Sequence, residues 1–150
     1  MHGINRMKIA ASLPPEAMLL QNFFALREDV LLAFLFGSLA RGKASETSDA
    51  DVAVLFSRRD TKNDLTLRAL SLKNDLEELL PRPVDLVILN GADAVIAMQV
   101  LQHGILVHEK AGARGEFIAR TVGVYEDLKR TRRPLEEALL RHLGVKPHGL

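Results

Sequence analysis

The sequence predicts a small α/β (α+β) protein in which a mixed β-sheet is flanked by α-helices. Helical and strand patterns alternate along the chain, the apolar runs are short, and turn residues separate them. Hydrophobic residues make up 47% of the 150 residues and charged residues 26%, which favours a globular chain over a disordered one. We therefore expect one domain over residues 1–150, with a core at about 14–109 and a C-terminal helical segment at 112–143.

The first half of the chain is predicted to form one helix and two strands. Glu16–Arg27 follows two prolines and has apolar residues in helical spacing, namely Met18, Leu19, Phe23 and Leu26. Val30–Phe36 is a continuous apolar run that ends at a glycine, which is typical of a strand buried on both faces. A loop from Gly37 to Ser48, with one helical turn at 39–41, leads to a second strand at Asp49–Phe56.

The second half alternates in the same way. Thr61–Leu80 predicts an amphipathic helix ended by Pro81, and its apolar side carries Leu65, Leu72, Leu76 and Leu79. The pattern then predicts a strand, a helix and a strand, at Val84–Leu89, Ala92–Gln102 and Ile105–His108. Gly112–Leu143 is helical again, and we expect Pro134 to divide this segment in two.

Composition excludes several classes of function. The formal charge is only +1, so the chain lacks the basic field that direct nucleic-acid binding requires. With no cysteine there is no disulfide, zinc-thiolate site or thiol nucleophile. The longest apolar run has 7 residues, Val30–Phe36, against the ~20 of a membrane helix. We expect a cytoplasmic protein with no membrane partner, and we assign no role to its five scattered histidines.

Three aspartates lie where strands are predicted. Side chains alternate along a strand, so Asp49 and Asp51 point the same way, with Cα atoms roughly 6 to 7 Å apart. Asp85 stands alone in the apolar third strand, where a carboxylate needs a partner. Three neighbouring carboxylates repel one another, and a divalent cation removes that conflict. Oxygen ligands of this kind favour magnesium or manganese.

A structural interpretation of these aspartates stays open. A single Asp-x-Asp is more often a turn-exit pair than a metal site, because short motifs have a high false-positive rate. Asp85 would then be an edge-strand residue, or would pair with a buried cation such as Arg82 or Arg114.

A glycine-serine pair follows the first strand directly. Gly37 lets the backbone approach a ligand closely, and Ser38 is suited to start a helical turn whose N–H groups face an anion such as a triphosphate. Arg41 and Lys43 would add charge-assisted contacts. Taken alone, Gly37-Ser38 reads equally as an ordinary strand-to-helix turn.

The joint pattern resembles a known superfamily. Gly37-Ser38-Leu39-Ala40-Arg41-Gly42, followed by Ser48-Asp49-Ala50-Asp51, is similar to the motif of the minimal nucleotidyltransferase (MNT, MntA-like) family within the DNA polymerase beta-like nucleotidyltransferases. The resemblance is strong over Val30–Leu89. The C-terminal tail, Gly112–Leu150, has only a general likeness to the family. It implies a nucleotidyltransferase fold, two Mg²⁺ ions bound by Asp49, Asp51 and Asp85, and a triphosphate held by Gly37 and Ser38 with help from Arg41 and Lys43.

The resemblance also implies a reaction and a partner. A hydroxyl would attack the α-phosphorus of ATP, pyrophosphate would leave, and Asp85 would lower the pKa of the acceptor. Members of the family act as antitoxins that add AMP to a tyrosine of a HEPN-family toxin. Two alternatives remain: adenylylation of a small molecule, as in aminoglycoside-type enzymes, and an antitoxin that neutralises its partner by binding alone. The last predicted helix carries an apolar surface between residues 117 and 128. This surface would serve either as a docking face for the partner or as part of the protein core.

Overall fold

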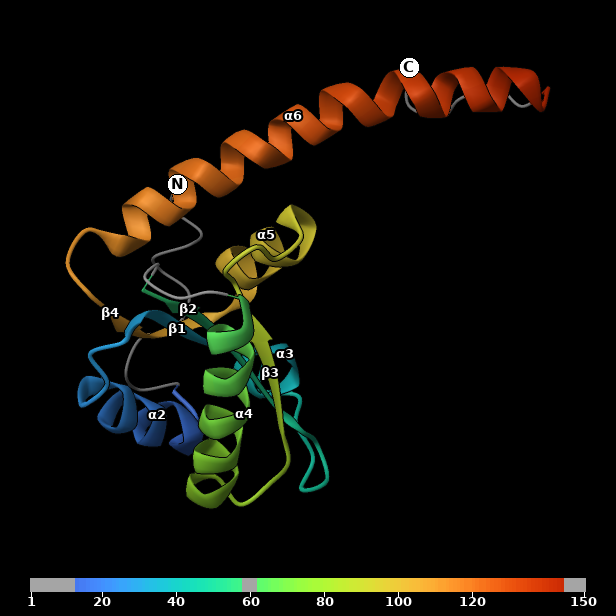
Figure 1. The fold of residues 1–150 in the computed structure, drawn as a ribbon. Helices are drawn as coiled ribbons and strands as arrows, with labels where there is room; N and C mark the ends of the chain where they lie inside the picture. Colours follow the sequence, from blue (N-terminus) through green and yellow to red (C-terminus); the bar gives the residue numbers. More distant parts are fainter. Residues whose placement is uncertain (1–12, 58–61, 145–150) are drawn as a thin grey trace.

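A computed structural model describes residues 13–57 and 62–144 of the chain. Helices and strands alternate in the predicted order (Figure 1). The helices are α2 (Pro15–Ala25), α3 (Gly37–Ala40), α4 (Lys62–Leu79), α5 (Ala94–His103) and α6 (Ala113–His142). The strands are β1 (Val30–Phe36), β2 (Ala50–Phe56), β3 (Val84–Ile88) and β4 (Ile105–Glu109). The predicted α/β class and the succession of elements are confirmed.

The four strands form one mixed sheet in the order β3-β2-β1-β4. β1 pairs antiparallel with both β2 and β4, whereas β2 and β3 are parallel. A parallel pair needs a crossover connection, which α4 supplies. The start of β2 therefore lies beside both the end of β1 and the start of β3, which brings three separate segments to one end of the sheet.

Helices cover both faces of the sheet, as Figure 1 shows. On one face α2 and α4 pack through Ala17, Leu20, Phe24, Leu72 and Leu76. On the other face α5 and the first part of α6 pack through Ala97, Val100, Leu101 and Phe117. β2 serves both cores by alternation: Val52, Val54 and Phe56 face the first, while Ala53 and Leu55 face the second. This two-sided burial is what the apolar strands predicted.

The predicted apolar face of the first helix is wrong. Met18 and Leu26 are 58% and 86% exposed, and Leu19 is also exposed. The buried positions are instead Ala17, Leu20 and Phe24, with Phe23 only packed at the edge. Both sets of residues have helical spacing, so periodicity did not decide between them. Ala17, Leu20 and Phe24 are fully buried in the core, so the second set is the face that packs on the sheet.

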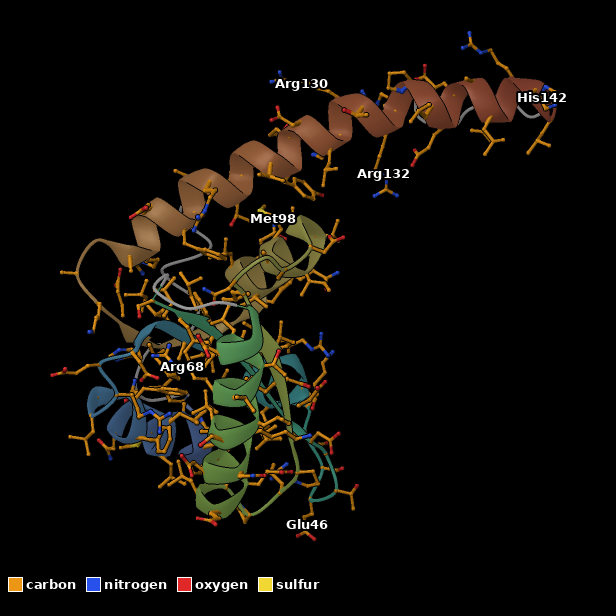
Figure 2. All side chains as sticks on the ribbon, viewed as in Figure 1. Glu46, Arg68, Met98, Arg130, Arg132 and His142 are labelled. Carbon is orange, nitrogen blue, oxygen red and sulfur yellow. The ribbon has the colours of Figure 1, made fainter. Side chains whose placement is uncertain are left out.

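Pro134 does not divide the last helix. α6 is continuous from Ala113 to His142 with the proline inside, and its distal half projects beyond the body of the protein (Figure 1). Pro134 removes the hydrogen bond to the carbonyl of Arg130, but both residues are exposed, so water can satisfy that carbonyl. Figure 2 shows Arg130, Arg132 and His142 along this projecting segment.

The second strand starts one residue later than predicted. It begins at Ala50, so Asp49 precedes it and is not a strand residue. The helix expected from Thr61 is described only from Lys62, because Thr61 lies outside the described residues. In the described segments, no helix is long and apolar enough to cross a bilayer.

Candidate active site

The sheet brings two of the three predicted carboxylates side by side. Asp51 is the second residue of β2 and is aligned with Phe36 at the end of antiparallel β1. On its other side Asp51 is aligned with Asp85 in parallel β3. The start of β3 is held by a further contact, because the backbone N–H of Val84 donates to the Glu77 carboxylate at 3.2 Å. The expected convergence of the second and third strands therefore occurs at this end of the sheet.

Gly37 lies directly against Asp51. Its φ of +71° belongs to the left-handed region, which favours glycine. A Cβ atom at this position would be 2.0 Å from Oδ2 of Asp51, so no other residue fits without moving the carboxylate. Glycine is needed here for two reasons, backbone conformation and close approach. The glycine loop and the aspartate form one compact unit.

The pKa of Asp51 depends on three neighbouring charged side chains as well as on burial. Partial burial raises the pKa of Asp51, and the Asp85 and Asp49 carboxylates raise it further. The Arg41 guanidinium lowers the pKa of Asp51 but does not offset the other effects. Three carboxylates and one arginine from separate elements thus share one electrostatic environment.

The glycine-serine segment starts a single helical turn, α3. One turn is too short for a substantial macrodipole, but its first N–H groups have no intrahelical partner and remain donors for an anion. Ser38 is partly buried in this turn, and its carbonyl accepts the backbone N–H of Lys43 at 2.9 Å. Arg41 and Lys43 are both exposed. Arg41 lowers the pKa of Asp51, whereas Lys43 is tied to the turn through its backbone N–H.

Asp49 reaches the site differently from the way the sequence suggested. It is exposed and lies in the last loop position before β2, so strand alternation does not orient it. The nearest backbone restraint is the N–H of Ala50, which donates to the Pro83 carbonyl at 2.8 Å. The loop itself must therefore place this carboxylate.

The donor set fits a divalent cation of the magnesium type. Carboxylate oxygens are its preferred ligands. The pKa of Asp51 is raised first by burial and then by the Asp85 and Asp49 carboxylates, and a cation would offset that repulsion. Among the described residues, no group of three or more acidic or histidine side chains is placed to hold a metal ion by itself. An open arrangement is compatible with magnesium, which takes one or two carboxylates and completes its shell with water and phosphate.

The two arginines considered as partners for Asp85 have other contacts. Arg82 donates to the carbonyls of Ser45 and Ser48, at 3.1 and 2.9 Å. Arg114 pairs with Glu109 at 3.7 Å. Asp85 itself is exposed. The sequence suggested Arg82 as a buried cation but did not indicate its contacts with the 45–48 segment.

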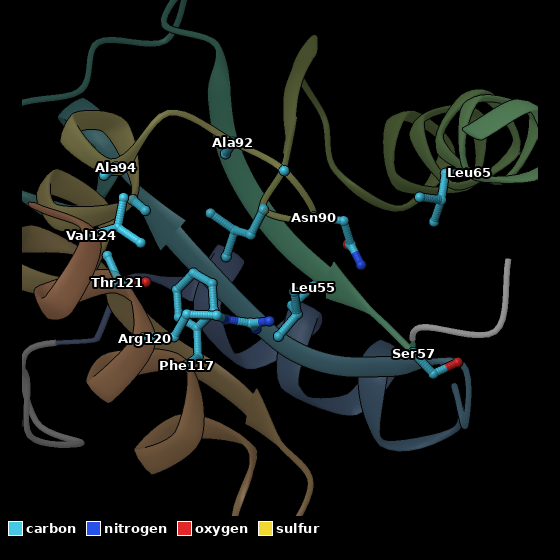
Figure 3. A pocket seen from close by; sticks show the side chains of 13 residues that line it. Leu55, Ser57, Leu65, Asn90, Ala92, Ala94, Phe117, Arg120, Thr121 and Val124 are labelled. Atoms are coloured by element: carbon cyan, nitrogen blue, oxygen red, sulfur yellow. The ribbon is translucent and has the colours of Figure 1, made fainter. Parts of the chain in front are cut away.

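An apolar hollow lies away from these carboxylates. A pocket of about 450 Å³ opens between α5, α6 and the far ends of β2 and β3, and none of the predicted site residues lines it (Figure 3). Figure 3 shows Phe117, Arg120 and Thr121 of α6 facing Leu55 and Asn90. Asn90 has a structural function, because its side chain bonds both backbone groups of Phe56, at 2.8 and 2.9 Å.

The comparison with known families agrees with this geometry. Residues 19–112 match the family model described as polymerase beta, nucleotidyltransferase. The chain belongs to this nucleotidyltransferase family. The matched segment contains the glycine-serine turn and all three aspartates.

Similarity to individual proteins indicates which branch of the nucleotidyltransferases the chain resembles. This nucleotidyltransferase is 34% identical over 80 residues to a Methanocaldococcus jannaschii protein named "Putative protein adenylyltransferase", covering 53% of this chain and 82% of the other. A toxin-antitoxin structure with AMP-PNP has a TM-score of 0.68 at 24% identity, over 85% of this chain and 99% of the other. An MNT antitoxin bound to a tri-AMPylated Shewanella oneidensis HEPN toxin has a TM-score of 0.62 at 25% identity, over 83% and 98%. The expected MNT family is confirmed.

Proposed function

We propose that this nucleotidyltransferase transfers AMP from ATP to a tyrosine hydroxyl of a HEPN-family toxin and so acts as the antitoxin of the pair. The observation that carries the proposal is the contact between Gly37 and Asp51, with Asp85 aligned beside them. This contact places the glycine-serine turn, which is suited to bind phosphate, next to the carboxylates of Asp51 and Asp85. The names of the relatives support the donor and the partner.

In this proposal each group has a stated task. Backbone N–H groups at Gly37 and Ser38 bind the triphosphate, and Arg41 adds positive charge. The acceptor oxygen attacks the α-phosphorus, the bond to the bridging oxygen breaks, and pyrophosphate leaves. Asp85 is exposed and accepts the hydroxyl proton. Mg²⁺, held by Asp49, Asp51 and Asp85, would supply positive charge to the triphosphate. Lys43, exposed in the same loop, would bind the phosphates from the solvent side.

An exposed apolar stripe along α6 supports a protein acceptor. It includes Val124, Leu128, Leu135 and Leu139, whose intervals of four and seven residues place them on one side of the helix. A small-molecule enzyme has no need for such a surface. We propose that this stripe contacts the toxin.

The test is transfer of labelled AMP from ATP, with purified toxin as acceptor and magnesium present. We expect label on a toxin tyrosine with the wild-type protein and none with Asp85→Asn, which should still bind ATP. Label on aminoglycosides but not on toxin would support the small-molecule alternative. Neutralisation of the toxin by Asp85→Asn without any label would support an antitoxin that acts by binding alone.

A further inference from the structure

Arg82 links three separate segments close to the carboxylates. It lies in the turn between α4 and β3, and its side chain is only 14% exposed. One guanidinium nitrogen, Nη1, donates to the carbonyls of Ser45 and Ser48, at 3.1 and 2.9 Å. Another, Nη2, is 4.0 Å from the Glu16 carboxylate in the first turn of α2. Within the described residues, its Nε atom is buried without a hydrogen-bond partner.

The segment that Arg82 holds leads directly to Asp49. It has no regular secondary structure, and Figure 2 shows its tip, at Glu46, at the edge of the molecule. The segment is closed on itself, because the N–H of Ser45 donates to Oγ of Ser48 at 2.9 Å and their hydroxyls lie 3.2 Å apart. A closed turn moves as a unit, so fixing two of its carbonyls fixes the residue that follows.

The buried position of Arg82 costs folding free energy, so a contribution to stability does not explain it. A buried guanidinium and carboxylate lose hydration, and a 4.0 Å pair returns little of that free energy. Arg82 also leaves one buried N–H without a described acceptor. The guanidinium has fixed donor directions, which suits it to orient two carbonyls at once. Its contacts are those of a residue that sets geometry.

We propose that Arg82 is a positioning residue that holds the 45–48 turn and thereby places the Asp49 carboxylate beside Asp51 and Asp85, with Glu16 as its buried counter-charge. This inference rests on the proposed function for its effect on catalysis. The effect on the turn does not depend on that function. Asp51 and Asp85 are held by strand pairing, so Asp49 is the carboxylate whose position requires such a support.

The experiment compares Arg82→Gln and Arg82→Lys with Arg27→Gln. Arg27 is a matched control, because it is also a part-buried arginine, 27% exposed, and bonds Asp75 at 3.2 Å away from the turn. Magnesium is titrated into protein and ATP, and binding is followed by calorimetry. We expect Arg82→Gln to raise the magnesium concentration for half-maximal ATP binding by about tenfold, the scale on which supporting residues act on metal sites. Arg82→Lys should be intermediate, and Arg27→Gln should match wild type.

Amide hydrogen exchange over residues 45–50 separates this inference from the proposed function. We expect faster exchange in Arg82→Gln and unchanged exchange in Arg27→Gln, even if ATP binding proves independent of magnesium. Unchanged exchange in Arg82→Gln, or equal changes in both variants, would overturn the inference. If Arg82→Gln does not fold, Arg82→Lys and Glu16→Gln carry the same comparison.

Discussion

At the scale of single residues, Asp51 carries a charge that its surroundings oppose. Its folded-state pKa is raised by burial and by the Asp85 and Asp49 carboxylates, so the folded protein holds this proton more tightly than the unfolded chain does. The contribution of Asp51 to stability is therefore lost as pH rises from its ordinary pKa through the raised one, and the full cost is present above the raised pKa.

Neutralising Asp51 should remove that cost. We expect Asp51→Asn to have a higher melting temperature than wild type at pH 7 in EDTA, and a smaller advantage at pH 4. Added magnesium should raise the melting temperature of wild type more than that of the variant, because the cation offsets the same repulsion. A variant that melts below wild type in EDTA would show that the Asp51 charge is satisfied by a contact rather than opposed.

Ser38 provides a second test at this scale. Its hydroxyl is proposed to face the triphosphate, so Ser38→Ala should weaken ATP binding, measured by calorimetry, and leave the unfolding temperature unchanged. A loss of stability of about 1 kcal/mol with unaltered ATP affinity would instead identify Ser38 as a helix cap.

The sequence was informative where local pattern and tertiary context agreed. Val30–Phe36 was predicted with its observed bounds because both of its faces are buried, which an apolar run encodes directly. The alignment of Asp51 with Asp85 depends on the parallel pairing of β2 with β3, which no local pattern encodes. The buried face of α2 was not predictable either, because two sets of apolar residues both had helical spacing and only the shape of the core selected one. The structural support from Arg82 was not predictable, since it depends on contacts across 34 and 37 residues.

At the scale of elements, the turn from β1 into α3 depends on Gly37. Gly42, five residues on, has nearly the same φ, +70° against +71°, but has open space where a Cβ would lie. Alanine at either position would lower the free energy of unfolding by roughly 1 kcal/mol, because it must adopt a left-handed backbone conformation. Only alanine at position 37 also meets the Asp51 carboxylate.

The two alanine variants therefore separate backbone strain from site geometry. Gly42→Ala should lose about 1 kcal/mol in urea unfolding and keep its ATP affinity. Gly37→Ala should lose more stability and most of its ATP affinity, because the Asp51 carboxylate must move. Equal losses of affinity in both variants would mean that the turn needs flexibility rather than close contact with Asp51.

At the scale of the whole molecule, α6 has two different halves. Phe117 and Thr121 in the first half are buried against α5 and the sheet. The second half projects from the body and is charged on most sides, with Arg132 paired to Glu136 at 3.4 Å. The apolar stripe nevertheless continues into this half through Leu135 and Leu139, where the described parts of the chain offer no core to cover it. A helix needs no apolar side chains there for its own folding, so the stripe favours an external partner.

The last prediction uses two leucine pairs with the same exposure. Leu135 and Leu139 on α6 are 66% and 57% exposed, and Leu67 and Leu70 on α4 are also 66% and 57% exposed. Replacing either pair with glutamate changes little of the folded core, so both double variants should melt near wild type and bind ATP equally well. Only Leu135→Glu with Leu139→Glu should lose affinity for a HEPN toxin, measured by sedimentation or calorimetry, and should transfer AMP to it more slowly. Toxin binding that survives in the α6 variant, or that is lost equally in the α4 variant, would show that the partner docks elsewhere on the nucleotidyltransferase.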